Sequence, residues 1–266
     1  MQGEAWADEA VRDARPNRAR FGAIALSAVM FAPTVAACGA DDDAVLVLAA
    51  ASLTDVLTQM EADFESANPG VDIQVSFAGT NAVQVQIEQG APADVVAFAD
   101  TTSMDELVAG GDVRHDDVTV FAQNRIVLAT PTDDPGDIAE LADLADPGRT
   151  IGLCAPAVPC GALAAELLDR AGVDASPDTE EPDVRSLVAK LVSGELDAGL
   201  IYATDATAFG DELRVVPDLG VDDVTNTYTV AVIADSQRRS PAERFVEFVL
   251  SEAGSEILLL AGFDLP

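Results

Sequence analysis

Two hydroxyl side chains in the N-terminal half stand where a predicted strand gives way to a predicted helix. The first is Ser52, which follows an apolar run over 45–48 and precedes a predicted helix over 54–67, with Asp55 three residues further on. A serine and an acidic residue at this spacing are typical of a capping box, which satisfies the free N–H groups of the first helical turn. The same N–H groups, at the positive end of the helix dipole, could hold a small anion without any lysine or arginine. Ser52 is therefore either a helix cap or an oxyanion ligand.

Thr80 occupies a similar place in the next strand-to-helix unit. The run over 71–77 alternates like a strand, and Thr80 comes just before a predicted helix over 82–89. In open α/β sheets, ligands collect at the carboxyl ends of the strands, so this second junction favours a pocket shared with Ser52. Tyr202 ends another predicted strand and is either a packed aromatic or an O–H donor into such a pocket.

Cys154 and Cys160 lie six positions apart in a predicted loop. In an oxidising compartment they are plausible disulfide partners. A metal site or a catalytic thiol would need further ligands or a base, and the only histidine, His115, lies far away in the sequence with no local motif. We therefore favour a disulfide. Pro159 directly precedes Cys160 near the start of a predicted helix over 162–171, which leaves the Cys160 backbone N–H free to donate.

The composition excludes several classes of protein. With 266 residues, 49% of them hydrophobic, the chain can bury a core of one large or two modest domains. The formal net charge is −33, from 47 acidic residues against 14 lysines and arginines. So acidic a surface repels nucleic acid and anionic lipid, and neither is an expected partner.

Residues 1–37 have the pattern of a lipoprotein signal peptide. Four arginines between positions 12 and 20 precede an apolar run over 21–32, which is too short for an ordinary membrane span. The small residues before Cys38 resemble a bacterial lipobox, which predicts that Cys38 is lipidated and that 38–43 form a tether. The leader is long and begins with acidic residues, which suggests that translation starts downstream of Met1. The alternative is ordinary secretion with Cys38 as a spare thiol.

Strands and helices alternate along 44–266, which is typical of an α/β protein whose sheet is covered by helices. Asp183 is the predicted cap of a helix over 184–193. We predict strands over 45–48, 71–77, 94–98, 118–121, 125–130, 150–153, 197–202, 213–216 and 228–233, and helices over 54–67, 82–89, 101–109, 137–145, 162–171, 184–193, 241–251 and 252–260.

Six short motifs follow one another in a specific order and spacing: Ala49-Ala-Ala-Ser-Leu-Thr54, Ser76-Phe-Ala-Gly-Thr80, Gln86-Ile-Glu-Gln-Gly-Ala-Pro-Ala-Asp94, Pro159-Cys-Gly161, Asp183-Val-Arg185 and Gly199-Leu-Ile-Tyr-Ala-Thr-Asp205. Together they resemble the periplasmic molybdate-binding proteins of ABC importers. The resemblance covers 44–266 and implies a two-lobed periplasmic-binding-protein-like fold (type II), each lobe a mixed sheet flanked by helices, with the ligand in the inter-lobe cleft. Lobe one would be 44–122 plus 228–266 and lobe two 125–225, with crossovers near Asn124 and Asn226.

The resemblance also implies a ligand set. By position, the family's contacts fall on residues that would touch the oxygens of molybdate or tungstate and would not ligate the metal directly: Ser52, Thr80, Cys160, Val184 and Tyr202. Many relatives have serine where Thr80 stands and alanine where Cys160 stands, so the Thr80 methyl could narrow the pocket. The implied protein is no enzyme and carries no cofactor. We expect a monomer, lipid-anchored through Cys38 on the extracytoplasmic face of the membrane, with an ABC transporter permease as partner.

Three alternatives remain open. The ligand could be another tetrahedral oxyanion such as sulfate. The chain could be an extracellular serine hydrolase with Ser52 as nucleophile, but His115 lies in a predicted loop and no G-x-S-x-G motif surrounds Ser52. A purely structural cell-surface module is disfavoured by the convergence of donor groups at helix starts.

Overall fold

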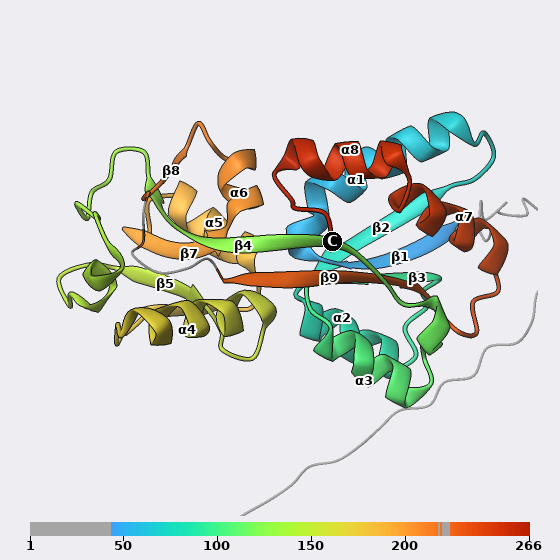
Figure 1. Cartoon of the computed structure of the whole chain (residues 1–266), viewed down its shortest axis with the longest axis horizontal. Helices are drawn as coiled ribbons and strands as arrows, with labels where there is room; N and C mark the ends of the chain where they lie inside the picture. The colour runs from blue at the N-terminus through green and yellow to red at the C-terminus, as the bar shows by residue number, and fades with distance from the viewer. Residues whose placement is uncertain (1–43, 218, 220–223) are drawn as a thin grey trace, which may run out of the picture. The chain divides into compact units, whose positions relative to one another are not determined.

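The computed structural model describes residues 44–217, 219 and 224–266 (Figure 1). The predicted signal peptide, Cys38 and the tether over 38–43 lie outside the described residues. The described strands are β1 Val45–Ala50, β2 Ile73–Ala78, β3 Val95–Phe98, β4 Thr119–Pro131, β5 Ile151–Cys154, β6 Thr179–Glu181, β7 Ala198–Tyr202, β8 Leu213–Val215 and β9 Thr225–Val232. The α-helices are α1 Thr54–Ala67, α2 Thr80–Glu88, α3 Thr102–Gly110, α4 Pro159–Ala171, α5 Val184–Val192, α6 Ala203–Ala208, α7 Arg239–Val249 and α8 Glu252–Ala261.

The strands over the described residues form one nine-stranded sheet in the order β2-β1-β3-β9-β4-β7-β5-β6, with β8 paired to β4. β1 runs parallel to β2 and β3, whereas β9 is antiparallel to both β3 and β4. On the other side β4 is antiparallel to β7, and β5 is parallel to β6 and β7. The sheet is therefore mixed, and the predicted α/β class is confirmed.

Successive side chains of β1 pack on opposite faces of the sheet. Val47 and Ala49 belong to a cluster completed by α1, α7 and α8, whereas Leu48 belongs to one completed by α2 and α3. The apolar run without alternation is explained by this burial on both faces, as predicted. Figure 1 shows these helices on the two sides of the sheet.

A third hydrophobic cluster is built from buried residues between 126 and 224 only. The other two draw on stretches between 45 and 122 and between 228 and 263. β4 passes from one set to the other, because Phe121 and Ala122 belong to the cluster completed by α1, α7 and α8, whereas Ile126 and Leu128 belong to the third cluster. The lobes predicted over 44–122 with 228–266 and over 125–225 remain a proposal, which this division of the cores supports.

The two strands predicted over 118–121 and 125–130 are one continuous strand, β4. It is irregular between Val120 and Ala122, but its pairing with β9 continues through Asn124, which lies opposite Asn226. The prediction of a break was wrong because the polar pair Gln123-Asn124 is a signal for a loop on propensity alone, whereas here both residues pair within the sheet.

The prediction of a helix over 137–145 was also wrong. Asp134 and Asp137 have φ angles of 43° and 49°, in the left-handed region, and only a 3-10 turn over Leu141–Ala145 is formed. Asp143 accepts hydrogen bonds from the N–H groups of Ala139 and Glu140, which favours the turn over a helix. The short elements β6 and α6 were not predicted.

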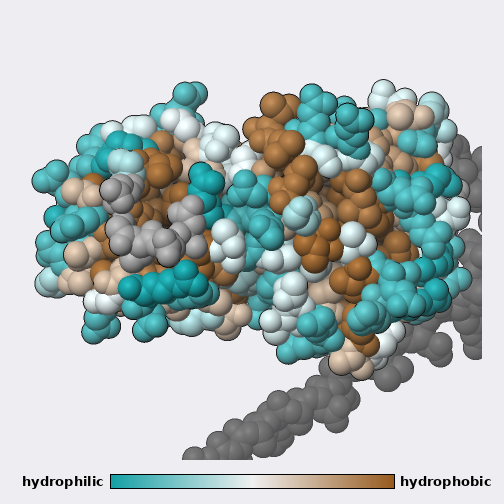
Figure 2. Space-filling view, viewed as in Figure 1, coloured by the Kyte–Doolittle hydropathy of each residue, from teal (hydrophilic) through white to brown (hydrophobic). Residues whose placement is uncertain are grey.

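The surface seen in Figure 2 is hydrophilic along much of its outer edge, in keeping with the net charge of −33. Apolar side chains gather over α8, where Leu259 and Leu260 are 55% and 78% exposed. Along the described residues, none of the helices has both the length and the apolar character that crossing a bilayer requires.

Candidate ligand-binding site

Six segments of the chain meet around one small cavity of about 20 Å³. This volume is far below the ~300–1,000 Å³ of sites for drug-sized ligands, so the cavity suits a compact ion. Among the described residues, no lysine or arginine lines it. The lining residues, which include all five ligand contacts predicted from the resemblance, are Ala50, Ala51, Ser52, Gly79, Thr80, Ala99, Val158, Pro159, Cys160, Asp183, Val184 and Tyr202.

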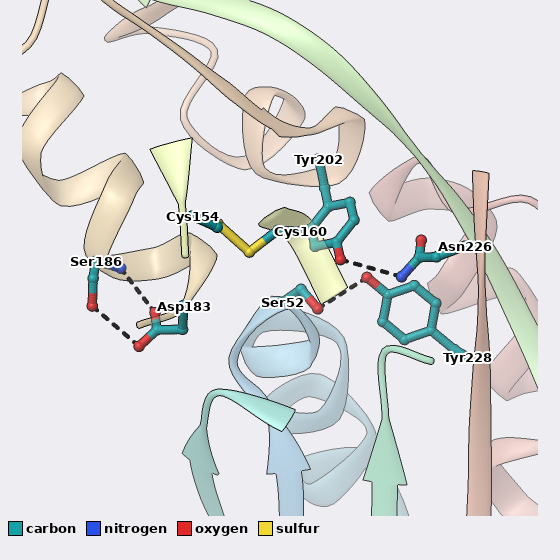
Figure 3. The surroundings of a disulfide bond; sticks show 8 residues. All are labelled: Ser52, Cys154, Cys160, Asp183, Ser186, Tyr202, Asn226 and Tyr228. Carbon is teal, nitrogen blue, oxygen red and sulfur yellow. Dashed lines mark hydrogen bonds between the residues drawn. A yellow bond between two sulfur atoms is a disulfide. The ribbon is translucent and has the colours of Figure 1, made fainter. Parts of the chain in front are cut away.

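Helix starts supply most of this lining. Thr80 is the first residue of α2, Cys160 the second of α4 and Val184 the first of α5. Backbone N–H groups at these positions have no acceptor within their own helix, so they remain free to bind a ligand. Asp183 caps α5, as predicted, by accepting a hydrogen bond from the Ser186 N–H at 2.9 Å (Figure 3). Its other carboxylate oxygen accepts from the Ser186 hydroxyl.

Ser52 does not cap a helix, which corrects the capping-box prediction. It lies in a 3-10 turn over Ala51–Leu53 that leads into α1, and neither element has a side-chain cap. The Ser52 hydroxyl instead shares a hydrogen bond of 2.9 Å with the Tyr228 hydroxyl (Figure 3). The carboxylate of Asp55 pairs with Arg185. Both residues of the expected capping box, Ser52 and Asp55, therefore bind partners distant in the sequence and do not bind the backbone of the helix start.

Tyr228 and two asparagines lie behind the cavity and were not predicted as site residues. Asn124 Nδ2 donates to Tyr228 Oη at 3.4 Å, and Asn226 Nδ2 donates to Tyr202 Oη at 3.2 Å. Burial raises the pKa of Tyr228 to about 12 and that of Tyr202 well above 10, so both hydroxyls keep their protons at neutral pH. A sequence signal existed, since crossovers were expected near Asn124 and Asn226, and Tyr228, one of only two tyrosines in the chain, begins the next predicted strand.

A guanidinium bound by two carboxylates lies beside the site. Arg185 Nε lies 2.9 Å from Asp205 Oδ1 without hydrogen-bond geometry, and Arg185 Nη2 contacts Asp55. Asp205 is completely buried, and its desolvation raises the pKa of the carboxyl to about 7, with Arg185 acting in the opposite direction. The guanidinium also lies over the Phe209 ring, 5.3 Å from its centroid. Its charge is thus neutralised locally and does not turn the cavity into a cationic site.

Two glycines allow backbones to approach closely around the cavity. A Cβ on Gly79 would lie 2.5 Å from the Pro182 carbonyl oxygen, and one on Gly161 would lie 1.9 Å from that of Ala155. Next to Gly79, Asn81 Nδ2 donates to the Ala157 carbonyl at 2.8 Å. These contacts bring the starts of α2, α4 and α5 together.

Cys154 and Cys160 form a disulfide whose Cα atoms are 5.8 Å apart (Figure 3). The bond ties the last residue of β5 to the second residue of α4, and both cysteines are buried. Cys160 therefore has no thiol to offer a ligand, and its contribution to the cavity is its backbone N–H.

His115 is far from this arrangement. It lies in a 3-10 turn over His115–Asp117, its side chain is 89% exposed, and it is absent from the cavity lining. No histidine is therefore placed to activate Ser52 as a hydrolase would require. Within the part of the chain that the structure describes, no group of three or more His, Cys, Asp or Glu side chains is arranged to hold a metal ion.

The family model for the bacterial extracellular solute-binding proteins matches residues 45–264. The chain belongs to this family. The molybdate-binding protein ModA of Mycobacterium tuberculosis is 34% identical to this solute-binding protein over 253 residues, which cover 91% of this chain and 97% of that protein. Members of the family are solute-binding proteins and not enzymes, which argues against the hydrolase alternative at the family level.

Solved structures show the same fold. The periplasmic molybdate-binding protein of Azotobacter vinelandii superimposes on this solute-binding protein with a TM-score of 0.72 at 20% identity, covering 84% of this chain and 99% of that one. The sulfate-binding protein SubI of Mycobacterium tuberculosis gives a TM-score of 0.73 at 19% identity, with 83% and 86% covered. The predicted periplasmic-binding-protein-like fold is confirmed.

Proposed function

We propose that this solute-binding protein captures molybdate, and also tungstate, outside the cytoplasm and delivers the anion to an ABC importer. One observation carries the proposal: one small cavity is lined by all the residues at which the resemblance to molybdate-binding proteins predicts contacts, and by no cationic side chain from the part of the chain that the structure describes. The 34% identity with ModA of Mycobacterium tuberculosis supports the choice of ligand.

In this proposal the anion is bound by neutral donors. Ser52, Thr80 and Tyr202 would offer hydroxyl groups, whereas Cys160 and Val184 would offer backbone N–H groups at helix starts, where the helix dipole favours negative charge. The Asp183 carboxylate also lines the cavity, but both of its oxygens are engaged by Ser186. No cofactor takes part, and the metal of the oxyanion would be surrounded by its own oxygens.

Ligand size would discriminate among dianions of equal charge. Sulfate is smaller than molybdate, so it cannot reach all donors at good hydrogen-bond length in a pocket built for the larger ion. A pocket adapted to sulfate would bind sulfate more tightly than molybdate. The experiment must therefore compare the two anions directly.

We expect molybdate and tungstate to stabilise the protein strongly. Ligand at about 100 times its dissociation constant adds roughly 2.7 kcal/mol to the free energy of unfolding, or about 5–10 °C in melting temperature for a domain of this size. Sulfate and phosphate at the same concentration should do much less. The measurement is a thermal-shift panel with all four anions. If sulfate stabilises as well as molybdate, the ligand is wrongly assigned.

Tyr202→Phe extends the same test to the site. It removes one donor that lines the cavity, so molybdate should bind about tenfold more weakly while the unliganded variant still folds. An unchanged molybdate affinity would place the anion elsewhere.

Cys38 is proposed to be lipidated, which would hold the protein at the extracytoplasmic face of the membrane beside its permease. The wild-type protein should then partition with membranes, and Cys38→Ala should be released or left unprocessed. The measurement is fractionation followed by N-terminal mass spectrometry. Recovery of the wild type from the medium with an unmodified N-terminus would refute the anchor.

A further inference from the structure

Two asparagines face each other on the strands that join the two sets of cores. Asn124 on β4 is the direct cross-strand partner of Asn226 on β9. Both are buried, and neither lines the cavity. Each nevertheless donates to the hydroxyl of a tyrosine, Asn124 to Tyr228 and Asn226 to Tyr202.

Neighbouring groups fix the orientation of both side-chain amides. Asn124 Oδ1 accepts from the Arg125 N–H at 3.0 Å, so its Nδ2 must face Thr204 Oγ1 at 2.9 Å and Tyr228 Oη at 3.4 Å. Asn226 Nδ2 donates to the Ala99 carbonyl, and a flipped amide would bring two oxygens together there. In this orientation Asn226 Oδ1 is a buried acceptor without a partner among the described residues. The hydrogen bond from Nδ2 to the Ala99 carbonyl nevertheless fixes the amide this way round.

The amide orientation decides which way the hydroxyl protons point. Tyr228 Oη accepts from Asn124, and its single proton needs an acceptor, which Ser52 Oγ supplies at 2.9 Å. Because Ser52 Oγ then accepts from Tyr228, its own proton is left for the cavity that Ser52 lines. Tyr202 Oη likewise accepts from Asn226, and its own proton has the neighbouring Tyr228 hydroxyl as an acceptor until an anion replaces it.

We infer that Asn124 and Tyr228 are positioning residues that fix the direction of the hydroxyl chain Asn124–Tyr228–Ser52, so that Ser52 turns its proton toward a bound anion and the site disfavours oxyanions that carry a proton. The inference rests on the proposed oxyanion-binding function and names a determinant of its selectivity. A protonated oxyanion such as hydrogen phosphate would turn an O–H toward side-chain and helix-start donors, since both oxygens of the lining carboxylate, Asp183, are already engaged by Ser186. An unpaired donor of this kind weakens binding by about tenfold or more.

Asn124→Asp tests the direction of the chain. The carboxylate has nearly the same shape, and it would accept from the Arg125 N–H, the Thr204 hydroxyl and the Tyr228 hydroxyl. Tyr228 would then donate away from Ser52, Ser52 would donate to Tyr228, and the Ser52 lone pairs would face the cavity. The reversed chain should tolerate a protonated oxyanion.

The readout is the ratio of the dissociation constants for phosphate and molybdate, measured by competition at about pH 8, where phosphate is mainly a dianion that keeps one proton. The extra negative charge of Asn124→Asp disfavours both dianions alike, so it cancels in the ratio. We expect the ratio to fall by about tenfold or more relative to the wild type. A ratio that stays within about threefold of the wild-type value overturns the inference.

Tyr228→Phe decides the question if Asn124→Asp does not fold. It removes a hydroxyl that does not line the cavity, and we expect molybdate to bind about five- to tenfold more weakly because the Ser52 proton is no longer directed. The matched control is Thr229→Val, at the next residue of β9. It loses a partly buried hydrogen bond to the Asp100 carbonyl, which is not part of the hydroxyl chain, and should bind within about twofold of the wild type. Wild-type affinity in Tyr228→Phe overturns the inference. Failure of the wild type itself to bind molybdate would instead refute the proposed function.

Discussion

Gly161→Ala should weaken molybdate binding by about 100-fold or more and lower the free energy of unfolding by about 1–3 kcal/mol. The added Cβ would lie 1.9 Å from the Ala155 carbonyl oxygen and 2.7 Å from that of Cys154, and these are backbone atoms that cannot rotate away. The disulfide between Cys154 and Cys160 ties this loop to the start of α4. The helix start must therefore shift as a unit, and the Cys160 N–H moves out of register with the other donors.

Titration calorimetry with molybdate and urea unfolding measure the two effects. Gly210→Ala is the matched control, because the nearest atoms to its added Cβ lie 3.5 and 3.6 Å away, at ordinary contact distance. It should change stability by less than about 0.5 kcal/mol and leave affinity unaltered. Full molybdate affinity in Gly161→Ala would show that the start of α4 is not part of the site.

Arg185→Met should destabilise the protein by about 3–5 kcal/mol at about pH 8, because it leaves the buried Asp205 carboxylate without its cation. The loss should shrink toward about pH 5. The pKa of Asp205 is already raised to about 7 in the folded protein, and it rises further once Arg185 is gone. Between about pH 4 and that pKa the folded state binds a proton that the unfolded state lacks, so stability falls as pH rises, and it falls further in the variant.

Urea unfolding of the wild type and of Arg185→Met across this pH range tests whether stability falls as pH rises. Arg170→Met is the matched control, since Arg170 pairs with Glu166 one helical turn away and both side chains are about half exposed. It should cost less than about 0.5 kcal/mol at every pH. A loss in Arg185→Met that is independent of pH would mean that Asp205 is not the group left uncompensated.

Local patterns were sufficient to predict most of the fold and the cavity lining. The start of α1 at Thr54, the Asp183 cap and the position of Tyr202 at the end of β7 all depend on residues within a few positions of one another. The strand-to-helix junctions of Ser52 and Thr80 are local in the same way. Their convergence on one cavity then followed from the tendency of ligands to collect at strand ends.

What could not be predicted depends on partners distant in the sequence. Ser52 and Tyr228 are 176 residues apart, and no local signal shows that a tyrosine hydroxyl replaces the expected capping bond. Arg185 and Asp205 come from different helices, and only the fold buries that carboxyl beside a guanidinium. The continuity of β4 was missed for a related reason, because Asn124 finds its strand partner in Asn226.

The separation of the hydrophobic clusters has a consequence for cooperativity. Buried side chains between 126 and 224 form one core, and the remaining cores come from the rest of the described chain, while one continuous sheet joins the two groups. The cavity takes Ser52 and Thr80 from one group of segments and Cys160, Val184 and Tyr202 from the other. An oxyanion held by all five residues would bridge the two groups of cores, so ligand binding should oppose any local opening between them as well as stabilise the whole fold.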